Sequence, residues 1–285
     1  MILSKIGFRQ HCVFALTVVL LILSGFASLA ASLNLVLGNP SAADAKQPDN
    51  YLLDKQCYAL SYNNSQGVPN WVAWRLSLDD LGDVIRKDSF APDMDLPAGF
   101  KRVTPSDYIG SGFDKGHQTP FADRSSSEES AAMTFKMSNM LPQSPILNRK
   151  AWEQLESYCR SLVKRGKVLY IVCGPLGQGG IGQDLERKTV IGKNKVRVPE
   201  ACWKVILIVD KAMDPIKGGK RTTADFRLIA VVMPNDMTPT DWSKYRVSVK
   251  SIENLTKLKF YSKLPESIMG PLKESVDNVR INNHQ

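Results

Sequence analysis

Two stretches near the start of the folded region alternate between larger apolar residues and smaller or polar ones. The first covers residues 58–62 and the second runs from Trp71 to Leu76. Residues 63–67, Asn-Asn-Ser-Gln-Gly, lie between them and have the composition of a turn. This pattern predicts a β-hairpin over residues 58–76.

The longest helical pattern begins at Ser144-Pro145 and can end at Gly166. Its apolar positions recur at helical spacing: Leu147, Ala151, Leu155, Cys159 and Leu162. Apolar, β-branched runs follow and predict further strands: 168–172, 203–209 and 228–232. Residues 245–249 alternate and lead into a short helix near Ile252. Together these elements predict an α+β fold, in which a sheet-rich body carries one prominent central helix.

The first 30 residues have the organisation of an export signal. A start with only two charged side chains, Lys5 and Arg9, precedes an apolar block that reaches Leu33. Small residues at Ser28 and Ala30 predict cleavage after Ala30, and an uncleaved membrane anchor is the alternative. We therefore expect an exported protein, periplasmic or extracellular, with no stable membrane partner once residues 1–30 are removed.

After the signal, the sequence predicts a short linker followed by one domain. Residues 39–51 are polar and contain proline, so residues 31–50 are predicted to be an N-terminal linker. No repeat or long low-complexity stretch interrupts the rest. We therefore expect a single folded domain over residues 51–285, and we expect it to be a monomer.

Composition and charge narrow the classes of function. With 43% hydrophobic and 23% charged residues among 285, the chain can bury a large core, which excludes a wholly disordered protein. The formal charge is +9, and it falls to +7 when residues 1–30 are removed with Lys5 and Arg9. The positive charge therefore belongs to the folded domain and predicts an acidic partner such as nucleic acid or an anionic surface.

Four cysteines remain after residue 30, and their spacings fit no zinc motif. They are Cys57, Cys159, Cys173 and Cys202. An exported chain permits disulfides, and four cysteines allow three complete pairings. Buried free thiols are the equally open alternative.

His117 is the only histidine in the body of the expected domain, because His11 lies in the signal and His284 is the second-last residue of the chain. A lone histidine is ordinarily a structural residue. His117, however, ends the sequence Asp-Lys-Gly-His at residues 114–117. On an extended strand Lys115 and His117 lie on one face and Asp114 on the other. This grouping favours His117 as a general base.

The long helix carries a second set of polar candidates, Asn148, Glu156 and Arg160. In an undistorted α-helix, Asn148 and Glu156 are separated by about 80° around the axis and roughly 12 Å along it. They could not both bind one cation directly, so Glu156 would reach it through water. A cation with few protein ligands and many waters is typical of Mg²⁺. A capping residue and a surface charge are the structural alternative.

These motifs resemble those of the DNA/RNA non-specific endonuclease family. Residues 114–117 are similar to its Asp-Arg-Gly-His signature, and residues 139–143, Asn-Met-Leu-Pro-Gln, are similar to a second family motif. A second asparagine follows nine residues after the first, and then Trp152 and a Leu-Glu pair. The likeness extends from about Leu35 to the C-terminal region and is strongest to secreted cyanobacterial nucleases.

The resemblance implies a central antiparallel sheet body with a ββα-metal (His-Me finger) active site. It implies that His117 is the general base and that Asn148 is the direct ligand of Mg²⁺, with Mn²⁺ as a substitute. Glu156 would hold metal-bound water and act in catalysis with Arg86 and Lys115. Lys115, Asn139 and Arg160 would contact the substrate.

The implied activity is a sugar-nonspecific endonuclease that cuts single- and double-stranded DNA and RNA and leaves 5′-phosphates. Relatives are controlled by a dedicated polypeptide inhibitor, which would be a further partner. Lys115 stands where the family usually has arginine, and lysine supplies a charge without a bidentate fork. A nucleic-acid-binding protein of the same fold with weak turnover is therefore the alternative function.

Four other signals are given less weight. Residues 177–182 fit a dinucleotide-binding fingerprint, but no amphipathic helix follows, so a surface loop is expected. A Cys/His peptidase would need a cysteine beside His117, and nothing local supports one. Tryptophans 71, 74 and 203 lie in strand patterns and are expected in the core. The basic residues of 193–197 could follow a phosphate backbone or simply be solvated.

Overall fold

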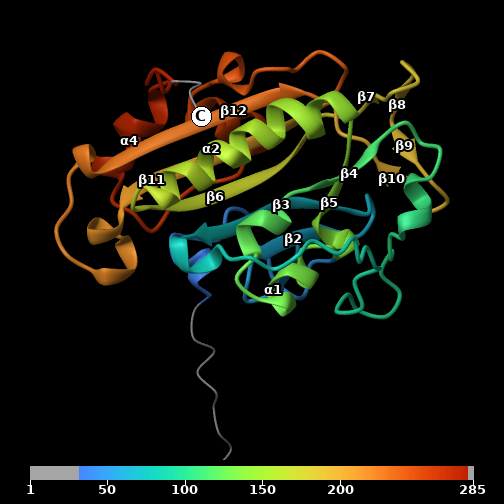
Figure 1. Ribbon diagram of the computed structural model, residues 1–285, viewed down its shortest axis with the longest axis horizontal. Helices are drawn as coiled ribbons and strands as arrows, with labels where there is room; N and C mark the ends of the chain where they lie inside the picture. The colour runs from blue at the N-terminus through green and yellow to red at the C-terminus, as the bar shows by residue number, and fades with distance from the viewer. Residues whose placement is uncertain (1–31, 282–285) are drawn as a thin grey trace, which may run out of the picture. The chain divides into compact units, whose positions relative to one another are not determined.

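The computed structural model describes residues 32–281, and an antiparallel six-stranded sheet forms its centre (Figure 1). The strand order is β1-β2-β3-β6-β11-β12, and every neighbouring pair is antiparallel. The strands are β1 (Tyr51–Asp54), β2 (Ala59–Asn63), β3 (Val68–Leu76), β6 (Lys167–Leu176), β11 (Ala201–Asp210) and β12 (Phe226–Pro234). The predicted hairpin is β2–β3, and the three later apolar runs are β6, β11 and β12, so these predictions are confirmed.

Three two-stranded ribbons lie outside the central sheet. They are β4 (Asp114–His117) with β5 (Met140–Gln143), β7 (Gly180–Ile181) with β8 (Arg187–Lys188), and β9 (Val190–Ile191) with β10 (Val196–Arg197). The glycine-rich stretch leads into the β7–β8 ribbon, and residues 182–190 contain no helix. A dinucleotide-binding βαβ unit is therefore absent there, as expected from the sequence.

The predicted central helix is present and begins with an irregular turn. Leu147–Trp152 forms a π-helical turn that continues into α2 (Glu153–Lys164). Gly166 follows with a φ of +83°, where glycine is favoured. The other α-helices are α1 (Glu128–Met133), α3 (Val249–Thr256) and α4 (Glu266–Glu274).

Short 3₁₀ turns connect these elements at Leu33–Leu35, Pro48–Asn50, Leu78–Asp80, Pro105–Tyr108, Phe121–Arg124, Met137–Asn139, Lys211–Met213, Pro215–Lys217, Thr223–Asp225 and Trp242–Tyr245. No helix within residues 32–281 is long and apolar enough to cross a membrane. The predicted signal at residues 1–30 lies outside the described residues.

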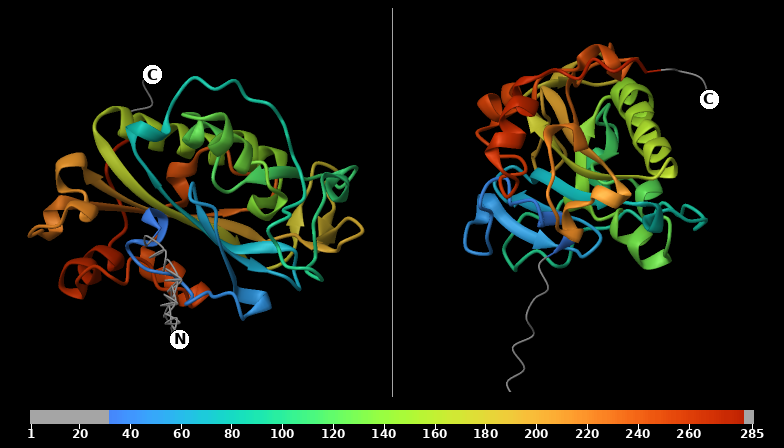
Figure 2. Two further views of the ribbon diagram at one scale, coloured as in Figure 1. Left: turned by 90° about the horizontal axis from the view of Figure 1, so that it is seen from below. Right: turned by 90° about the vertical axis from the view of Figure 1, so that its left-hand side faces the viewer.

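The sheet separates two hydrophobic cores, because side chains alternate between its faces. Leu169, Ile171 and Cys173 of β6 face α2, whereas Val168, Tyr170 and Val172 face α3 and α4. Figure 2 shows α2 and α4 on opposite sides of the strands. The three strand tryptophans are at most 1% exposed, so their expected place in the core is confirmed.

The N-terminal segment differs from the predicted linker. Leu37 and Ala43 are buried in the core beneath α3 and α4. The backbone carbonyls of Leu37 and Pro40 accept hydrogen bonds from Lys263 and Lys259. A polar, proline-bearing composition indicated a linker, but the few apolar side chains of this segment pack into the core on the α3 and α4 face of the sheet. Residues 32–50 are therefore part of the folded unit.

A second difference concerns residues 245–249. Their alternation predicted a strand, but only Arg246 pairs with a strand, through an isolated bridge to Val231. The preceding 3₁₀ turn and the start of α3 at Val249 leave too few extended residues for a ladder. The short helix expected near Ile252 is present as α3. The four cysteines of the described chain are free thiols.

Candidate active site

A cavity of about 450 Å³ opens between the β4 strand and the start of the long helix. Six of the seven site residues predicted from the sequence line it: Arg86, Lys115, His117, Asn148, Glu156 and Arg160. They come from a loop, from β4 and from three turns of helix, so the tertiary fold collects residues that are far apart in the chain. No cysteine is among the lining residues, which argues against the Cys/His peptidase.

The β4–β5 ribbon presents Lys115 and His117 to this cavity, as the strand alternation predicted. Gly116 between them faces the other way and lies against Gln143 of β5. A Cβ atom at Gly116 would come within 2.0 Å of the Gln143 side-chain oxygen. Any larger residue would push the ribbon apart, which explains a glycine directly before the histidine.

His117 lies in an apolar setting that keeps its imidazole neutral. Its ring packs edge-on against Phe135 at 4.9 Å between ring centres and lies 5.4 Å from Phe90. Burial lowers the pKa of His117 to about 3, and the nearby positive charges of Arg86 and Lys115 act in the same direction. Its Nε2 atom is buried and has no hydrogen-bond partner within residues 32–281. A neutral imidazole can accept a proton, as a general base must.

Lys115 forms no ion pair with any residue of the described chain. Its ammonium lies 4.8 Å from the centre of the Phe90 ring, within range of a cation–π contact. The neighbouring carboxylate of Asp114 is instead held by Arg149, at 2.7 and 2.8 Å, and by the amide of Asn148. The positive charge of Lys115 is therefore free to face an anion in the cavity.

Arg86 is more exposed than Lys115 and Arg160. Its guanidinium lies 5.4 Å from the centre of the Phe135 ring, and its Nε donates to Asp88 at 2.7 Å. The side chain is 52% exposed, so this ion pair is weak and open to exchange for another anion.

The π-helical turn brings Asn148 and Glu156 to the same cavity. One additional residue in a turn reduces their offset around the axis from about 80° to about 20°. The offset of about 80° that the sequence predicted is therefore wrong, because it assumed a regular α-helix. π-turns are found mostly as single turns in α-helices, often at functional sites.

Glu156 is buried and held by cations. Its Oε1 accepts from the ammonium of Lys204 at 3.2 Å. Burial raises the pKa of Glu156, and the charges of Lys204 and Arg160 oppose that shift. Arg160 in turn donates to Asp123 at 3.1 Å and to Ser157 at 2.8 Å, so its guanidinium is already positioned by the protein.

These donors fit a hydrated Mg²⁺ better than a fully protein-ligated metal. The side-chain oxygen of Asn148 is free to face the cavity because its amide nitrogen donates to Asp114 at 2.9 Å. Within residues 32–281 no group of three His, Cys, Asp or Glu residues could enclose an ion. One amide oxygen, one carboxylate and room for water are typical of Mg²⁺ sites.

Asn139 is the predicted site residue that the structure places elsewhere. It is fully buried, and its amide donates to the backbone carbonyls of Thr119 and Thr134. It also accepts from the backbone N–H of Thr119 at 3.0 Å. Because these bonds use its polar atoms, Asn139 cannot bind the substrate in this arrangement and instead anchors the loop that follows His117.

The sequence did not single out two further residues of this region, Arg149 and Lys204. Arg149 lines the cavity and holds Asp114. Lys204 lies beneath Glu156 in the middle of β11. Lys204 had a signal that could have identified it, because it is the only charged residue in the apolar run 201–209. Arg149 had none, since it follows Asn148 on an exposed helical turn.

Several known proteins are similar to this chain in sequence and in fold. A model of the DNA/RNA non-specific endonuclease family matches residues 41–267. A nuclease of Nostoc sp. (strain PCC 7120 / SAG 25.82 / UTEX 2576) is 48% identical over 254 residues, which cover 88% of each chain. Human mitochondrial endonuclease G is 35% identical over 217 residues, 73% of this chain and 69% of that protein.

A solved structure agrees with these relatives. The crystal structure of the EndoG/EndoGI complex matches the fold with a TM-score of 0.67 and 27% identity, over 82% of this chain and 91% of that one. The predicted α+β class with one long central helix is thereby confirmed. Because the family model matches most of the chain and the relatives are nucleases, this chain is a nucleic-acid-hydrolysing enzyme that belongs to the DNA/RNA non-specific endonuclease family.

Proposed function

We propose that the protein is an exported, Mg²⁺-dependent endonuclease that hydrolyses DNA and RNA to products with 5′-phosphates. One observation carries this proposal. Within residues 32–281 the side chains of His117 and Lys115 have no hydrogen-bond or ion-pair partner, and they line one cavity together with the free amide oxygen of Asn148. These are the groups that in-line hydrolysis of a phosphodiester requires.

In the proposed reaction, the neutral imidazole of His117 accepts a proton from water as the water oxygen attacks phosphorus. The oxygen–phosphorus bond forms in line with the bond to the 3′ oxygen, which breaks, so the phosphate stays on the 5′ side. Lys115 and Arg86 face the negative charge that develops on the phosphoryl oxygens. Asn148 would hold a divalent cation directly and Glu156 would hold it through water, and the cation would supply Lewis-acid stabilisation of that charge.

The same groups account for cleavage of both sugars. Lysine, arginine and a cation address the phosphate and carry no information about the sugar or the base. None of them needs the 2′-hydroxyl by which proteins tell RNA from DNA. We therefore propose single- and double-stranded DNA and RNA as substrates.

The test is nicking of a supercoiled plasmid and of a labelled RNA by residues 31–285, with Mg²⁺, Mn²⁺ or EDTA. Cleavage with either metal, none with EDTA and 5′-phosphate ends on the products are expected. Asn148→Ala should raise the Mg²⁺ concentration needed or remove activity. Binding of nucleic acid without cleavage by the parent protein would instead support the alternative, a weakly active binding protein with lysine in place of arginine at position 115.

Export and inhibition are separate parts of the proposal. The signal pattern at residues 1–30 supports release to the periplasm or the exterior, and the N-terminal sequence of the mature protein would test cleavage after Ala30. The matching structure is that of a nuclease with its inhibitor. A polypeptide inhibitor that covers the cavity is therefore proposed, and loss of cleavage on adding a candidate inhibitor would test it.

A further inference from the structure

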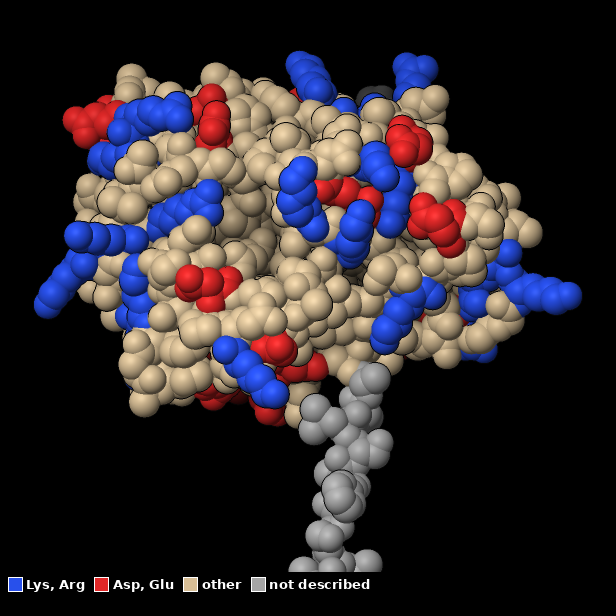
Figure 3. All heavy atoms as spheres, turned by 180° about the vertical axis from the view of Figure 1, so that it is seen from behind, with Lys and Arg blue, Asp and Glu red and all other residues tan. Residues whose placement is uncertain are grey.

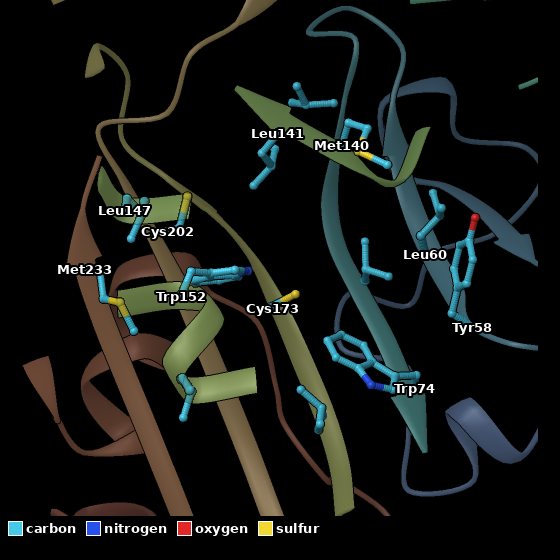
Figure 4. Close-up of a cluster of buried hydrophobic side chains, with 14 of the residues drawn as sticks. Tyr58, Leu60, Trp74, Met140, Leu141, Leu147, Trp152, Cys173, Cys202 and Met233 are labelled. Atoms are coloured by element: carbon cyan, nitrogen blue, oxygen red, sulfur yellow. The ribbon is translucent and has the colours of Figure 1, made fainter. Parts of the chain in front are cut away.

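Lys204 is a lysine in a place that lysines rarely occupy. It is 1% exposed and lies on the α2 face of β11, between the core residues Cys202 and Ile206. Its ammonium is 3.2 Å from Oε1 of Glu156 and 4.1 Å from the centre of the Trp152 ring. A second indole, Trp74, lies 5.6 Å away. Figure 4 shows both indoles within the buried cluster on this side of the sheet.

Stability alone does not explain such a charge. Moving an ammonium and a carboxylate out of water costs several kcal/mol each, and apolar residues in their place often stabilise a protein. A second buried pair, Lys273 with Glu253 at 2.9 Å, joins α4 to α3 on the opposite face. Lys204 connects no such helix pair. Its partner is instead a carboxylate at the wall of the active-site cavity.

The hydrogen bond from Lys204 leaves the two carboxylate oxygens of Glu156 in different surroundings. Oε1 accepts from Lys204, and Oε2 forms no hydrogen bond within residues 32–281. Because Lys204 holds Oε1, the carboxylate of Glu156 cannot rotate freely. Its Oε2 atom remains available to a ligand in the cavity. Such partners of metal-site ligands fix orientation, and their loss typically lowers metal affinity or activity 10–100-fold.

The ammonium of Lys204 is also linked to His117, through the indole of Trp152. Trp152 lies against the ammonium, and its indole N–H donates to the backbone carbonyl of His117 at 3.3 Å. We propose that Lys204 is a positioning residue, which orients Glu156 toward the cavity directly and the backbone at His117 through Trp152. This role rests on the proposed function of the cavity.

The experiment compares the parent with Lys204→Met, which keeps most of the length of an apolar side chain beside the indoles but removes the ammonium group and its charge. Two midpoints are measured, the Mg²⁺ concentration for half-maximal cleavage and that for half of the Mg²⁺-induced shift in Tm without nucleic acid. Both should rise about 10–100-fold in the variant. In the Glu156→Gln background the same substitution should change them less than about two-fold, because coupled residues are not additive.

Lys273→Met is the matched control, since it also breaks a buried lysine–glutamate pair but on the other face of the sheet. It should lower Tm and leave both midpoints at the parent values. If Lys204→Met does not fold, Lys204→Gln is measured in the same way, because its shorter side chain also loses the charge and the contact with Glu156.

Midpoints of folded Lys204→Met or Lys204→Gln within two-fold of the parent would overturn the positioning role alone. An equal rise in the Glu156→Gln background would overturn the direct orientation of Glu156 by Lys204, since Lys204 would then set the Mg²⁺ midpoints through something other than Glu156. A parent protein that neither cleaves nor shows a Mg²⁺-dependent shift in Tm would refute the proposed function, and the positioning role with it.

Discussion

The two faces of the central sheet carry different kinds of buried polar residue. On the α3 and α4 face, Glu253 accepts from Lys273 and from the backbone of Phe260, and the hydroxyl of Tyr261 donates to the carbonyl of Tyr170. On the α2 face, several buried polar atoms near the β4–β5 ribbon have no hydrogen-bond partner within residues 32–281; they belong to His117, Gln118, Thr119 and Gln143.

This difference indicates which face is built for stability and which for chemistry. Leaving a buried polar group without a partner costs about 1–3 kcal/mol. A folded chain tolerates this cost where water, a cation or a substrate supplies the missing partner. The side of the molecule turned away from α2 has no surface of uniform charge, because its basic and acidic side chains are interspersed (Figure 3).

The largest expected difference between the faces is in activity. His117→Ala should reduce kcat/KM about 10²–10⁴-fold, the usual contribution of a general base, while the protein stays folded. Cleavage rates on one plasmid and one RNA, with circular dichroism as the check of folding, measure this. Turnover like that of the parent would remove His117 from the reaction.

A substitution on the α3 and α4 face should lower stability and leave activity unchanged. Lys273→Met leaves Glu253 as an unpaired buried charge and should lower the free energy of unfolding by about 3–5 kcal/mol. Its kcat/KM, measured well below its Tm, should equal that of the parent. Urea unfolding and cleavage assays on the same preparation test both parts, and a matching loss of activity would contradict the separation of the two faces.

Lys115 should show an intermediate effect. If its charge contacts the reacting phosphate, Lys115→Ala should cost about 1.5–3 kcal/mol of transition-state binding, or roughly 10- to 150-fold in kcat/KM. Lys115→Arg should keep or increase activity, because arginine can hold two phosphate oxygens. Equal rates for Lys115→Ala and the parent on DNA and RNA would show that this lysine takes no part in catalysis.

The neutral histidine should also be visible in the dependence of stability on pH. The pKa of His117 is about 3 in the folded protein and near 6.5 in the unfolded chain. Below pH 6.5 the unfolded state therefore binds a proton that the folded state does not, and this contribution to stability falls by up to about 1.4 kcal/mol per pH unit. Urea unfolding between pH 7 and 5 should give a steeper loss for the parent than for His117→Gln. Parallel curves would mean that His117 is not held neutral.

The smallest expected effect is on the salt dependence of binding. For His117→Ala, which binds without cutting, log Kd against log salt should change by roughly one unit of slope per phosphate neutralised. Adding Lys115→Ala should reduce this slope by about one. Lys259→Ala, an exposed lysine beyond α3, should leave the slope unchanged. If Lys115→Ala and Lys259→Ala reduced the salt slope equally, nucleic acid would bind over the whole surface of the protein.

Local patterns in the sequence determined much of this protein. Alternation and helical spacing identified the β2–β3 hairpin, the later strands and the long helix, because those elements bury one continuous apolar face. The sequence Asp-Lys-Gly-His placed Lys115 and His117 on one side of a strand, since side-chain direction in a strand is set by the backbone. With one histidine in the domain, the candidate base needed no tertiary information.

Tertiary structure decided the features that depend on contacts between distant segments. The π-turn at Leu147–Trp152 brought Asn148 and Glu156 together, and helical spacing cannot reveal such a turn. Asn139 was withdrawn from the cavity by hydrogen bonds to the backbone of the loop after His117. Lys204 became the partner of Glu156 only because β11 passes beneath α2, 48 residues farther along the chain. The pairing of distant charges is a property of packing, and the chain gives no local sign of it.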